Sequence, residues 1–189
     1  NTMVVNGRTW PRLEVEQARY RLRLLNGSNA RFLILRFEGE ALPFTQIGGD
    51  QGFLPAPITR TRLLLGPAER ADVVVDFSAL PPGTRIVLEN VGPDEPFGGG
   101  QPCVPGTTPG LDCDFEPSDP GSTGQVMAFD VVPRLFRDRS RVPAALPSEG
   151  PPPAPSRVRR ITLNEAMSGG QQGCYAEDGA PIVAPGTAN

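Results

Sequence analysis

The chain has 189 residues, which allows one domain with a substantial core and is short for two independent domains. It contains no His, all 18 of its basic residues are Arg, and its net charge of −3 offers no basic surface of the kind that nucleic acids require. Without His or Lys, the chain has no imidazole nucleophile, general acid or metal ligand and no Schiff-base lysine, so a self-contained enzyme is not expected.

The sequence pattern indicates neither a membrane helix nor a signal peptide within these 189 residues. No apolar run reaches the roughly 18 residues of a membrane helix, and the N-terminus lacks the basic and apolar regions of a signal peptide. Because the chain starts without Met, we expect a segment of a longer, exported protein whose signal lies upstream. No membrane partner and no nucleic-acid partner are expected.

The first predicted elements are a short β segment from residue 4, a turn at Asn6-Gly7 and a return strand through Leu13 and Val15. Trp10 stands before Pro11, in a position that disfavours helix. Because it is the only Trp, we expect it to close one end of the core, the alternative being an exposed aromatic that binds a ligand.

Residues 20–37, YRLRLLNGSNARFLILRF, carry the clearest strand pattern. In the first arm Tyr20, Leu22 and Leu24 alternate with Arg, which predicts a half-buried strand. The second arm is apolar on both faces, which predicts a central, covered strand. The polar turn from Asn26 to Asn29 between the two arms predicts a β-hairpin.

Further strands are predicted at 44–47, 58–65, 73–77, 84–90 and 125–132, with Gly- and Pro-rich turns between them. A spacing of about ten residues is typical of a Greek-key sandwich or barrel. Periodicity is lost over residues 92–124, which predicts a long acidic loop. We expect its carboxylates to be solvated, although such a cluster also attracts cations.

The loop contains two of the three cysteines. Nine residues separate Cys103 from Cys113, a spacing that predicts a disulfide closing the loop if the protein is exported. Metal binding by this pair is disfavoured, because the spacing is not CxxC and no His completes a ligand set. Cys174 is left over, either free or paired with a partner outside this chain.

The C-terminal part is rich in Arg and Pro. Residues 133–156 predict an extended linker, and no aromatic residues alternate with the arginines to stack on bases. Residues 161–165 predict one more strand. The predicted organisation is a domain over 1–132 with an insertion at 92–124, a linker over 133–156, and over 157–189 either the start of a following domain or a flexible tail.

Four stretches in this order resemble a known family: NGRTWPRLEVE, YRLRLLNGSNARF, QIGGDQGFLPAPI and LGPAERADVVVDFS. They are similar to the middle (second) cupredoxin-like domain of three-domain multicopper oxidases, in the laccase-like subgroup of bilirubin oxidase, spore-coat laccase and phenoxazinone synthase. The match is strong over residues 4–91 and weaker at 124–131 and 159–165. The predicted fold class is therefore all-β, a Greek-key cupredoxin-like sandwich or barrel with a long irregular insertion and a Pro/Arg-rich C-terminal linker.

The resemblance implies that a longer parent protein couples one-electron oxidation of small phenolic substrates to reduction of dioxygen to water, using copper. In the family the copper ligands are His residues and one Cys of the first and third domains, so a chain without His carries no catalytic, cofactor or metal residue. Its partners would be those two domains. The resemblance also implies that Phe97, Gly98 and Cys103 form part of the rim of the substrate pocket, and the arginine face of residues 19–23 is a candidate docking surface for a neighbouring domain.

Two other functional classes compete with this interpretation. A secreted β-sandwich interaction or carbohydrate-binding module would present exposed aromatics, for which Trp10, Tyr20 and Tyr175 are the candidates beside the Phe residues. A hydrolase built on two carboxylates would need two acids facing one cleft, and the sequence places no such pair.

Overall fold

The computed structural model describes residues 2–94, 96–104, 107–147, 150 and 153–162. The chain divides into two compact units, Asn1–Glu149 and Gly150–Asn189. The described residues of the second unit form neither helix nor strand. None of the described residues belongs to a helix long and apolar enough to cross a membrane.

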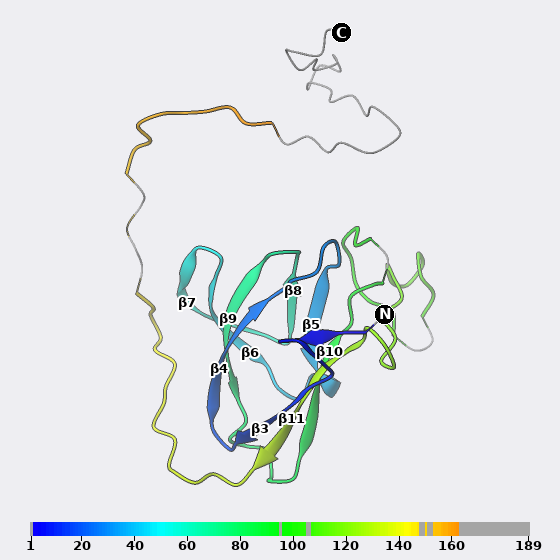
Figure 1. The fold of residues 1–189 in the computed structure, drawn as a ribbon, viewed down its shortest axis with the longest axis vertical. Helices are drawn as coiled ribbons and strands as arrows, with labels where there is room; N and C mark the ends of the chain where they lie inside the picture. Colours follow the sequence, from blue (N-terminus) through cyan, green and yellow to red (C-terminus); the bar gives the residue numbers. More distant parts are fainter. Residues whose placement is uncertain (1, 95, 105–106, 148–149, 151–152, 163–189) are drawn as a thin grey trace. The chain divides into compact units, whose positions relative to one another are not determined.

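The first unit contains two larger β-sheets (Figure 1). The five-stranded sheet has the order β3 (Arg12–Glu16), β11 (Gln125–Val132), β10 (Arg85–Asn90), β5 (Leu33–Phe37) and β8 (Arg62–Leu65). The four-stranded sheet has the order β4 (Arg19–Leu25), β9 (Arg70–Asp76), β6 (Phe44–Gly49) and β7 (Gly52–Arg60). A small hairpin of β1 (Val4–Val5) and β2 (Arg8–Thr9) precedes them, and a 3₁₀ turn, η1, spans Glu38–Glu40.

Burial along the strands follows the period of two that their sequences predict. Buried and partly buried positions alternate through β9 and β10, while β5 is buried at four of its five positions, as expected for a strand with neighbours on both sides in the sheet and apolar residues on both faces. The pairs are antiparallel except β3 with β11, which is parallel. The predicted all-β, Greek-key cupredoxin-like class is confirmed.

Aromatic side chains fill the space between the two sheets. Phe37 is fully buried and packs against Phe44, Phe77 and Phe129 at ring-centroid distances of 5.1, 6.1 and 5.7 Å. Phe37 and Phe129 belong to the five-stranded sheet, Phe44 belongs to the four-stranded sheet, and Phe77 follows β9. The four rings therefore tie distant parts of the sequence into one core. Tyr20 adds an edge-to-face contact with Phe77 at 5.8 Å and is partly buried.

The predicted hairpin over residues 20–37 is wrong. Its arms do form strands, but β4 pairs with β9 in one sheet and β5 pairs with β10 and β8 in the other. Asn26 explains the crossing, because its buried side chain donates to the carbonyls of Arg31 and Leu65 and accepts the Ser28 amide. These contacts hold the connection in a bend that leads from one sheet to the other instead of a tight hairpin turn.

The single strand predicted at 58–65 is also two strands. β7 ends at Arg60 in the four-stranded sheet, and β8 begins at Arg62 in the five-stranded sheet. The apolar pattern continues through the crossing, so periodicity alone does not reveal it. β7 contains Pro55 and Pro57, and its position at the edge of its sheet is the place where strands tolerate proline.

Trp10 does not belong to the buried core. It is half-buried, and its indole N–H donates to the carbonyl of Ser122, near the end of the insertion, at 3.3 Å. The expectation that Trp10 closes one end of the core is therefore replaced by a contact between the start of the domain and the insertion.

Residues 133–147, the first part of the predicted linker, are extended and lie against the four-stranded sheet; we call them the strap. The Asp138 carboxylate accepts the backbone N–H of Arg19 at 3.0 Å, and the Arg19 guanidinium donates to the Ser140 carbonyl at 2.9 Å. Farther on, the Leu146 amide donates to the Pro55 carbonyl of β7 at 3.1 Å. The backbone hydrogen bond from Arg19, with those from Ser140, lowers the pKa of Asp138 to about 2.

Candidate functional site

The two ends of the insertion at 92–124 are both hydrogen-bonded to one buried side chain, that of Asn90 at the end of β10. Its amide oxygen accepts the N–H groups of Ile34 and Gly92, each at 3.0 Å. Its amide nitrogen donates to the Ser118 hydroxyl at 3.2 Å and to the Thr123 carbonyl at 3.3 Å. Asn90 is 1% exposed. Because its four hydrogen bonds reach both ends of the insertion, this residue fixes the loop to the five-stranded sheet.

A second polar group reinforces this anchor. The Asp94 carboxylate accepts hydrogen bonds from the hydroxyls of Thr123 and Ser118 and pairs with the Arg31 guanidinium. The Thr123 hydroxyl is the main cause that lowers the pKa of Asp94, and Arg31 and Ser118 act in the same direction against partial burial. Asp94 is thus held ionised at the point where the loop leaves the sheet.

Between these anchors a disulfide joins Cys103 to Cys113, whose Cα atoms are 5.0 Å apart. Isolated bridges pair Pro102 with Phe115 and Pro109 with Cys113. At Gly100 the backbone has a φ of 96°, and a Cβ there would lie 2.2 Å from the Asp114 side chain. Only glycine fits this close approach. The described part of the insertion is therefore folded onto itself.

An aromatic cluster packs the closed loop against the sheet. The Phe97 ring lies 5.3 Å from that of Phe32, just before β5, and 5.6 Å from that of Phe115 in an edge-to-face contact. Phe97 therefore points toward the domain and is partly covered.

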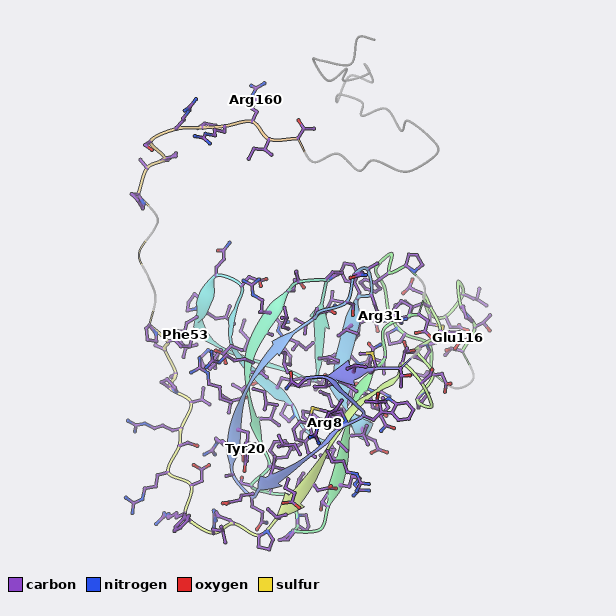
Figure 2. All side chains as sticks on the ribbon, in the orientation of Figure 1. Arg8, Tyr20, Arg31, Phe53, Glu116 and Arg160 are labelled. Carbon is purple, nitrogen blue, oxygen red and sulfur yellow. A yellow bond between two sulfur atoms is a disulfide. The ribbon has the colours of Figure 1, made fainter. Side chains whose placement is uncertain are left out.

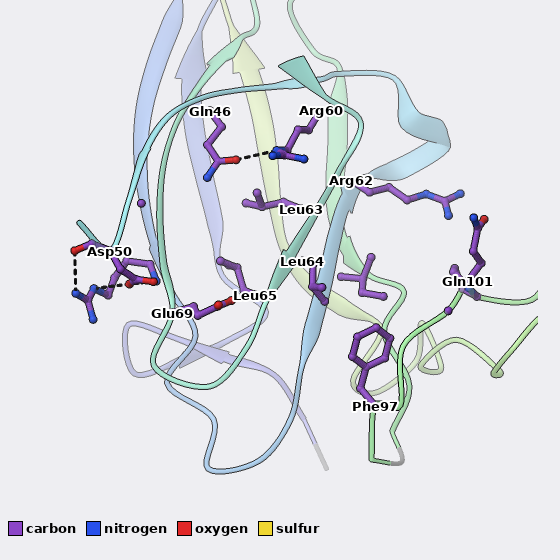
Figure 3. Close-up of a pocket in the computed structure, with 15 residues that line it drawn as sticks. Gln46, Asp50, Arg60, Arg62, Leu63, Leu64, Leu65, Glu69, Phe97 and Gln101 are labelled. Carbon is purple, nitrogen blue, oxygen red and sulfur yellow. Dashed lines mark hydrogen bonds and ion pairs between the residues drawn. The ribbon is translucent and has the colours of Figure 1, made fainter. Parts of the chain in front are cut away.

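The loop, β8 and the β6–β7 hairpin line a cavity of about 620 Å³ that is open to solvent (Figure 3). Leu64 of β8, which is 48% exposed, and Phe97 supply apolar surface. Gln46 and Arg60 supply polar groups from the other sheet, and the Arg60 guanidinium donates to the Gln46 amide oxygen at 2.8 Å. Loop residues, among them Gln101, form the remaining wall, as Figure 3 shows.

Most charged groups of this cavity are already paired. Arg62 contacts Glu40 at 2.8 Å, and Arg70 contacts Asp50 at 3.1 Å. The Glu69 carboxylate accepts the Gly66 N–H at 2.6 Å. Both acids that line the cavity thus have partners, which argues against the hydrolase alternative.

Of the three residues predicted at the pocket rim, only Phe97 lines the cavity. Gly98 is exposed. Cys103 is buried in the disulfide, and its neighbour Pro102 lines the cavity in its place. Sequence reasoning missed Gln46 of β6 and Arg60 of β7, which belong to the four-stranded sheet and line the cavity together with β8 of the other sheet.

Two arginines of the predicted arginine face, Arg19 and Arg21, make contacts within this chain. Arg19 pairs with Asp76 at 2.9 Å and holds the strap. Arg21 makes two hydrogen bonds to the Asp72 carboxylate, which raise the pKa of Arg21, and it lies over the Phe53 ring at 5.5 Å.

The residues that the structure describes do not fit copper. Imidazole is absent from the full sequence, and two of the three cysteines form the disulfide. Within the residues that the structure describes, no group of three or more Cys, Asp or Glu side chains is arranged to hold a metal ion.

No family model matches this chain. The similar proteins of known sequence are multicopper oxidases and laccases. The chain is 40% identical to multicopper oxidase LPR1 homolog 5 of Oryza sativa, over 86% of this chain and 24% of that protein. It is 49% identical to a laccase of Bacillus stratosphericus, over 47% of this chain and 17% of the laccase.

Solved structures agree with these relatives. The McoA multicopper oxidase of Aquifex aeolicus matches with a TM-score of 0.59 and 28% identity, over 80% of this chain and 29% of that one. The laccase-like multicopper oxidase CueO of Ochrobactrum sp. matches with a TM-score of 0.58 and 28% identity, over 80% and 28% of the two chains. The chain thus spans about a quarter of the length of such relatives. By sequence and by fold, this chain belongs to the multicopper oxidase family, as one of its cupredoxin-like domains.

Proposed function

We propose that the chain is the copper-free middle domain of a multicopper oxidase, bridging two copper-bearing cupredoxin domains and contributing a wall of the substrate pocket. The observation that carries the proposal is a 40% identity to a multicopper oxidase over 86% of a chain that contains no His. A domain of this family without imidazole contributes architecture rather than metal ligands.

The longer protein would couple one-electron oxidation of phenolic or related substrates to reduction of dioxygen to water, with its copper held outside this chain. The Ochrobactrum relative has oxidase activity towards lignin model compounds, which supports a phenolic substrate class. The disulfide favours an extracytoplasmic location, because such bonds persist in oxidising compartments.

The cavity bounded by Phe97 is the part of this chain that we assign to the pocket wall. Its lining combines apolar surface with the polar groups of Arg60 and Gln46, a combination that suits a ring bearing hydroxyl or methoxy groups. The disulfide and the Asn90 anchor hold this wall in place.

Replacing Phe97 with Ala in the longer enzyme tests this role. Loss of one aromatic contact should raise KM for bulky phenols about fivefold, the equivalent of roughly 1 kcal/mol, with copper content unchanged. Leu111→Ala is the matched control, since Leu111 lies in the same insertion but is 82% exposed and outside the cavity lining. Unchanged kinetics with every phenol for Phe97→Ala would refute the assignment.

Two of the aromatic candidates of the carbohydrate-binding alternative, Trp10 and Tyr20, make contacts within the domain, and Tyr175 lies outside the described residues. Trp10 is half-buried and bonded to Ser122, and the Tyr20 hydroxyl accepts the Glu16 amide N–H at 2.8 Å.

A further inference from the structure

Arg60 differs from the other arginines of the cavity beside the insertion in having no anionic partner among the described residues. The other two arginines in the lining, Arg62 and Arg70, are neutralised by Glu40 at 2.8 Å and by Asp50 at 3.1 Å. Within the described part of the chain, Arg60 makes a single side-chain hydrogen bond, and its partner is a neutral amide. Because a guanidinium stays cationic in proteins, its charge is available to a ligand.

Other charged groups near the insertion do not change this balance. Glu69 also lines the cavity, but its carboxylate accepts the Gly66 N–H at 2.6 Å, and Figure 3 shows Glu69 and Arg60 at opposite ends of the leucines of β8. Arg31, which is labelled in Figure 2, is already paired with Asp94. The cavity therefore has one end at which a cation is open to an incoming anion.

The pairing of β6 with β7 sets the position of the Arg60 guanidinium. The register places Arg60 opposite Phe44 and Gln46 opposite Ile58, so Gln46 and Arg60 are diagonal neighbours whose long side chains can meet. The Gln46 amide nitrogen donates to the Gly48 carbonyl at 3.2 Å, an orientation in which its amide oxygen faces Arg60. The Arg60 Nε donates to that oxygen at 2.8 Å.

This hydrogen bond occupies one of the five N–H donors of the guanidinium. The terminal Nη groups of Arg60 donate to no acceptor among the described residues, and the side chain is exposed to solvent. A guanidinium presents its N–H groups as a fixed fork that matches the two oxygens of a carboxylate. Arg60 is therefore held by Gln46 in a state ready to bind an external carboxylate.

Apolar surface lies next to this cation, on the other sheet and on the insertion. Leu64 of β8 is 48% exposed, and Phe97 lines the same cavity. Figure 3 shows the leucines Leu63 and Leu64 between Arg60 and Phe97. A ligand that matches this lining combines an aromatic ring, which packs on Leu64 and Phe97, with an anionic group at the end that meets Arg60.

We infer that Arg60 selects phenols that carry a carboxylate, of the hydroxybenzoate or hydroxycinnamate type, over the corresponding neutral phenols. This inference rests on the proposed function, which makes the cavity a wall of the substrate pocket, and it names the substrate subclass and the residue that selects it. The carboxylate accepts hydrogen bonds from the Arg60 Nη groups while the ring lies against Phe97. Gln46 is a positioning residue, because it acts through Arg60.

A pair of matched substrates tests the inference in the longer enzyme. Ferulate and its methyl ester carry the same phenol ring, and the carboxylate of ferulate is ionised at about pH 6.5, since such groups have a pKa of about 4. Arg60→Gln should lower the ratio of kcat/KM for ferulate to kcat/KM for the ester about fivefold, the upper end of the range for exposed ion pairs. Arg134→Gln removes the same charge from an exposed position of the strap and should leave the ratio unchanged. An unchanged ratio in Arg60→Gln would overturn the inference.

Gln46→Glu gives a second test that keeps the size of the side chain. Its carboxylate would neutralise Arg60, so the ratio should fall about as far as in Arg60→Gln, whereas a merely structural effect would change the kinetics of acid and ester alike. Salt gives a third measurement, because raising its concentration from about 0.01 M to about 1 M shortens the Debye length from about 30 Å to about 3 Å. The wild-type ratio should fall toward that of Arg60→Gln, and a ratio independent of salt would contradict the role of charge.

Binding to the 189-residue chain separates this inference from the proposed function, because it needs no copper. Millimolar ferulate, but not its methyl ester, should shift the NMR signal of the Arg60 Nε–H group, and no shift with either ligand would overturn the inference. A longer protein that binds copper and oxidises both phenols with a ratio insensitive to Arg60 would refute the selection by Arg60 alone. A longer protein that binds no copper, beside a 189-residue chain whose Arg60 responds to ferulate, would refute the proposed function alone.

Discussion

Asn90 offers the sharpest test of how the insertion is held. Asn90→Ala removes four hydrogen bonds at a residue that is 1% exposed, leaving the N–H groups of Ile34 and Gly92 without this acceptor. A buried N–H without a partner costs about 1–3 kcal/mol, so two of them lower the free energy of unfolding by about 2–6 kcal/mol. This is a large share of the roughly 5–15 kcal/mol that stabilises a domain.

Urea unfolding followed by circular dichroism measures this loss. The fluorescence of Trp10 reports on the same event from the insertion side, because its indole bonds to Ser122. Asn29→Ala is the matched control, since Asn29 is exposed and an exposed substitution of this kind changes stability by about 0.5 kcal/mol or less. A loss below about 1 kcal/mol for Asn90→Ala would refute the assignment of Asn90 as the anchor.

Three further outcomes follow from the packing, the disulfide and the strap. Phe37→Ala should lower the free energy of unfolding by about 3–5 kcal/mol in urea titrations, and a loss below about 1 kcal/mol would contradict the shared aromatic core. Replacing Cys103 and Cys113 by Ser should cost about 2–3 kcal/mol and speed proteolysis between residues 97 and 115; equal cleavage rates would show that the bond does not hold the loop. The pKa of Asp138 is lowered to about 2 from its ordinary 3.8, so the stabilisation it gives is present above about pH 4 and is lost as the pH falls toward 2. Cleavage of the strap by pepsin should accelerate across that window, and in Asp138→Asn it should already be fast at pH 4; a pH-independent wild-type rate would contradict this.

The sequence predicted strands well because the period of two reports which side chains face a core. Residues 84–90 and 125–132 are strands almost to the residue. The period of the side chains does not identify the partner of a strand, however. The pattern on either side of Asn26 therefore predicts one hairpin, although the two strands lie in different sheets. For the same reason, the sequence pattern does not show that the chain passes from one sheet to the other between Arg60 and Arg62.

The candidate site was less accessible to sequence reasoning. Family resemblance and position predict Phe97 at the rim of a substrate pocket; the structure shows Phe97 at a cavity, and its role in substrate binding stays a prediction. Arg60 and Gln46 gave no signal, because polar residues on an edge strand are ordinary and only the tertiary arrangement brings them to the loop. The strand pattern marks Asn90 only as the end of a strand, although its side-chain amide can accept two N–H groups and donate two hydrogen bonds.

The central claim is that this chain supports a multicopper oxidase without holding its copper. Copper titration with absorption spectroscopy, on the 189-residue chain and on the longer protein beside it, tests that claim most directly. We predict stoichiometric copper with an intense blue band in the longer protein and neither in the 189-residue chain. A stoichiometric blue copper site in the 189-residue chain would contradict the claim.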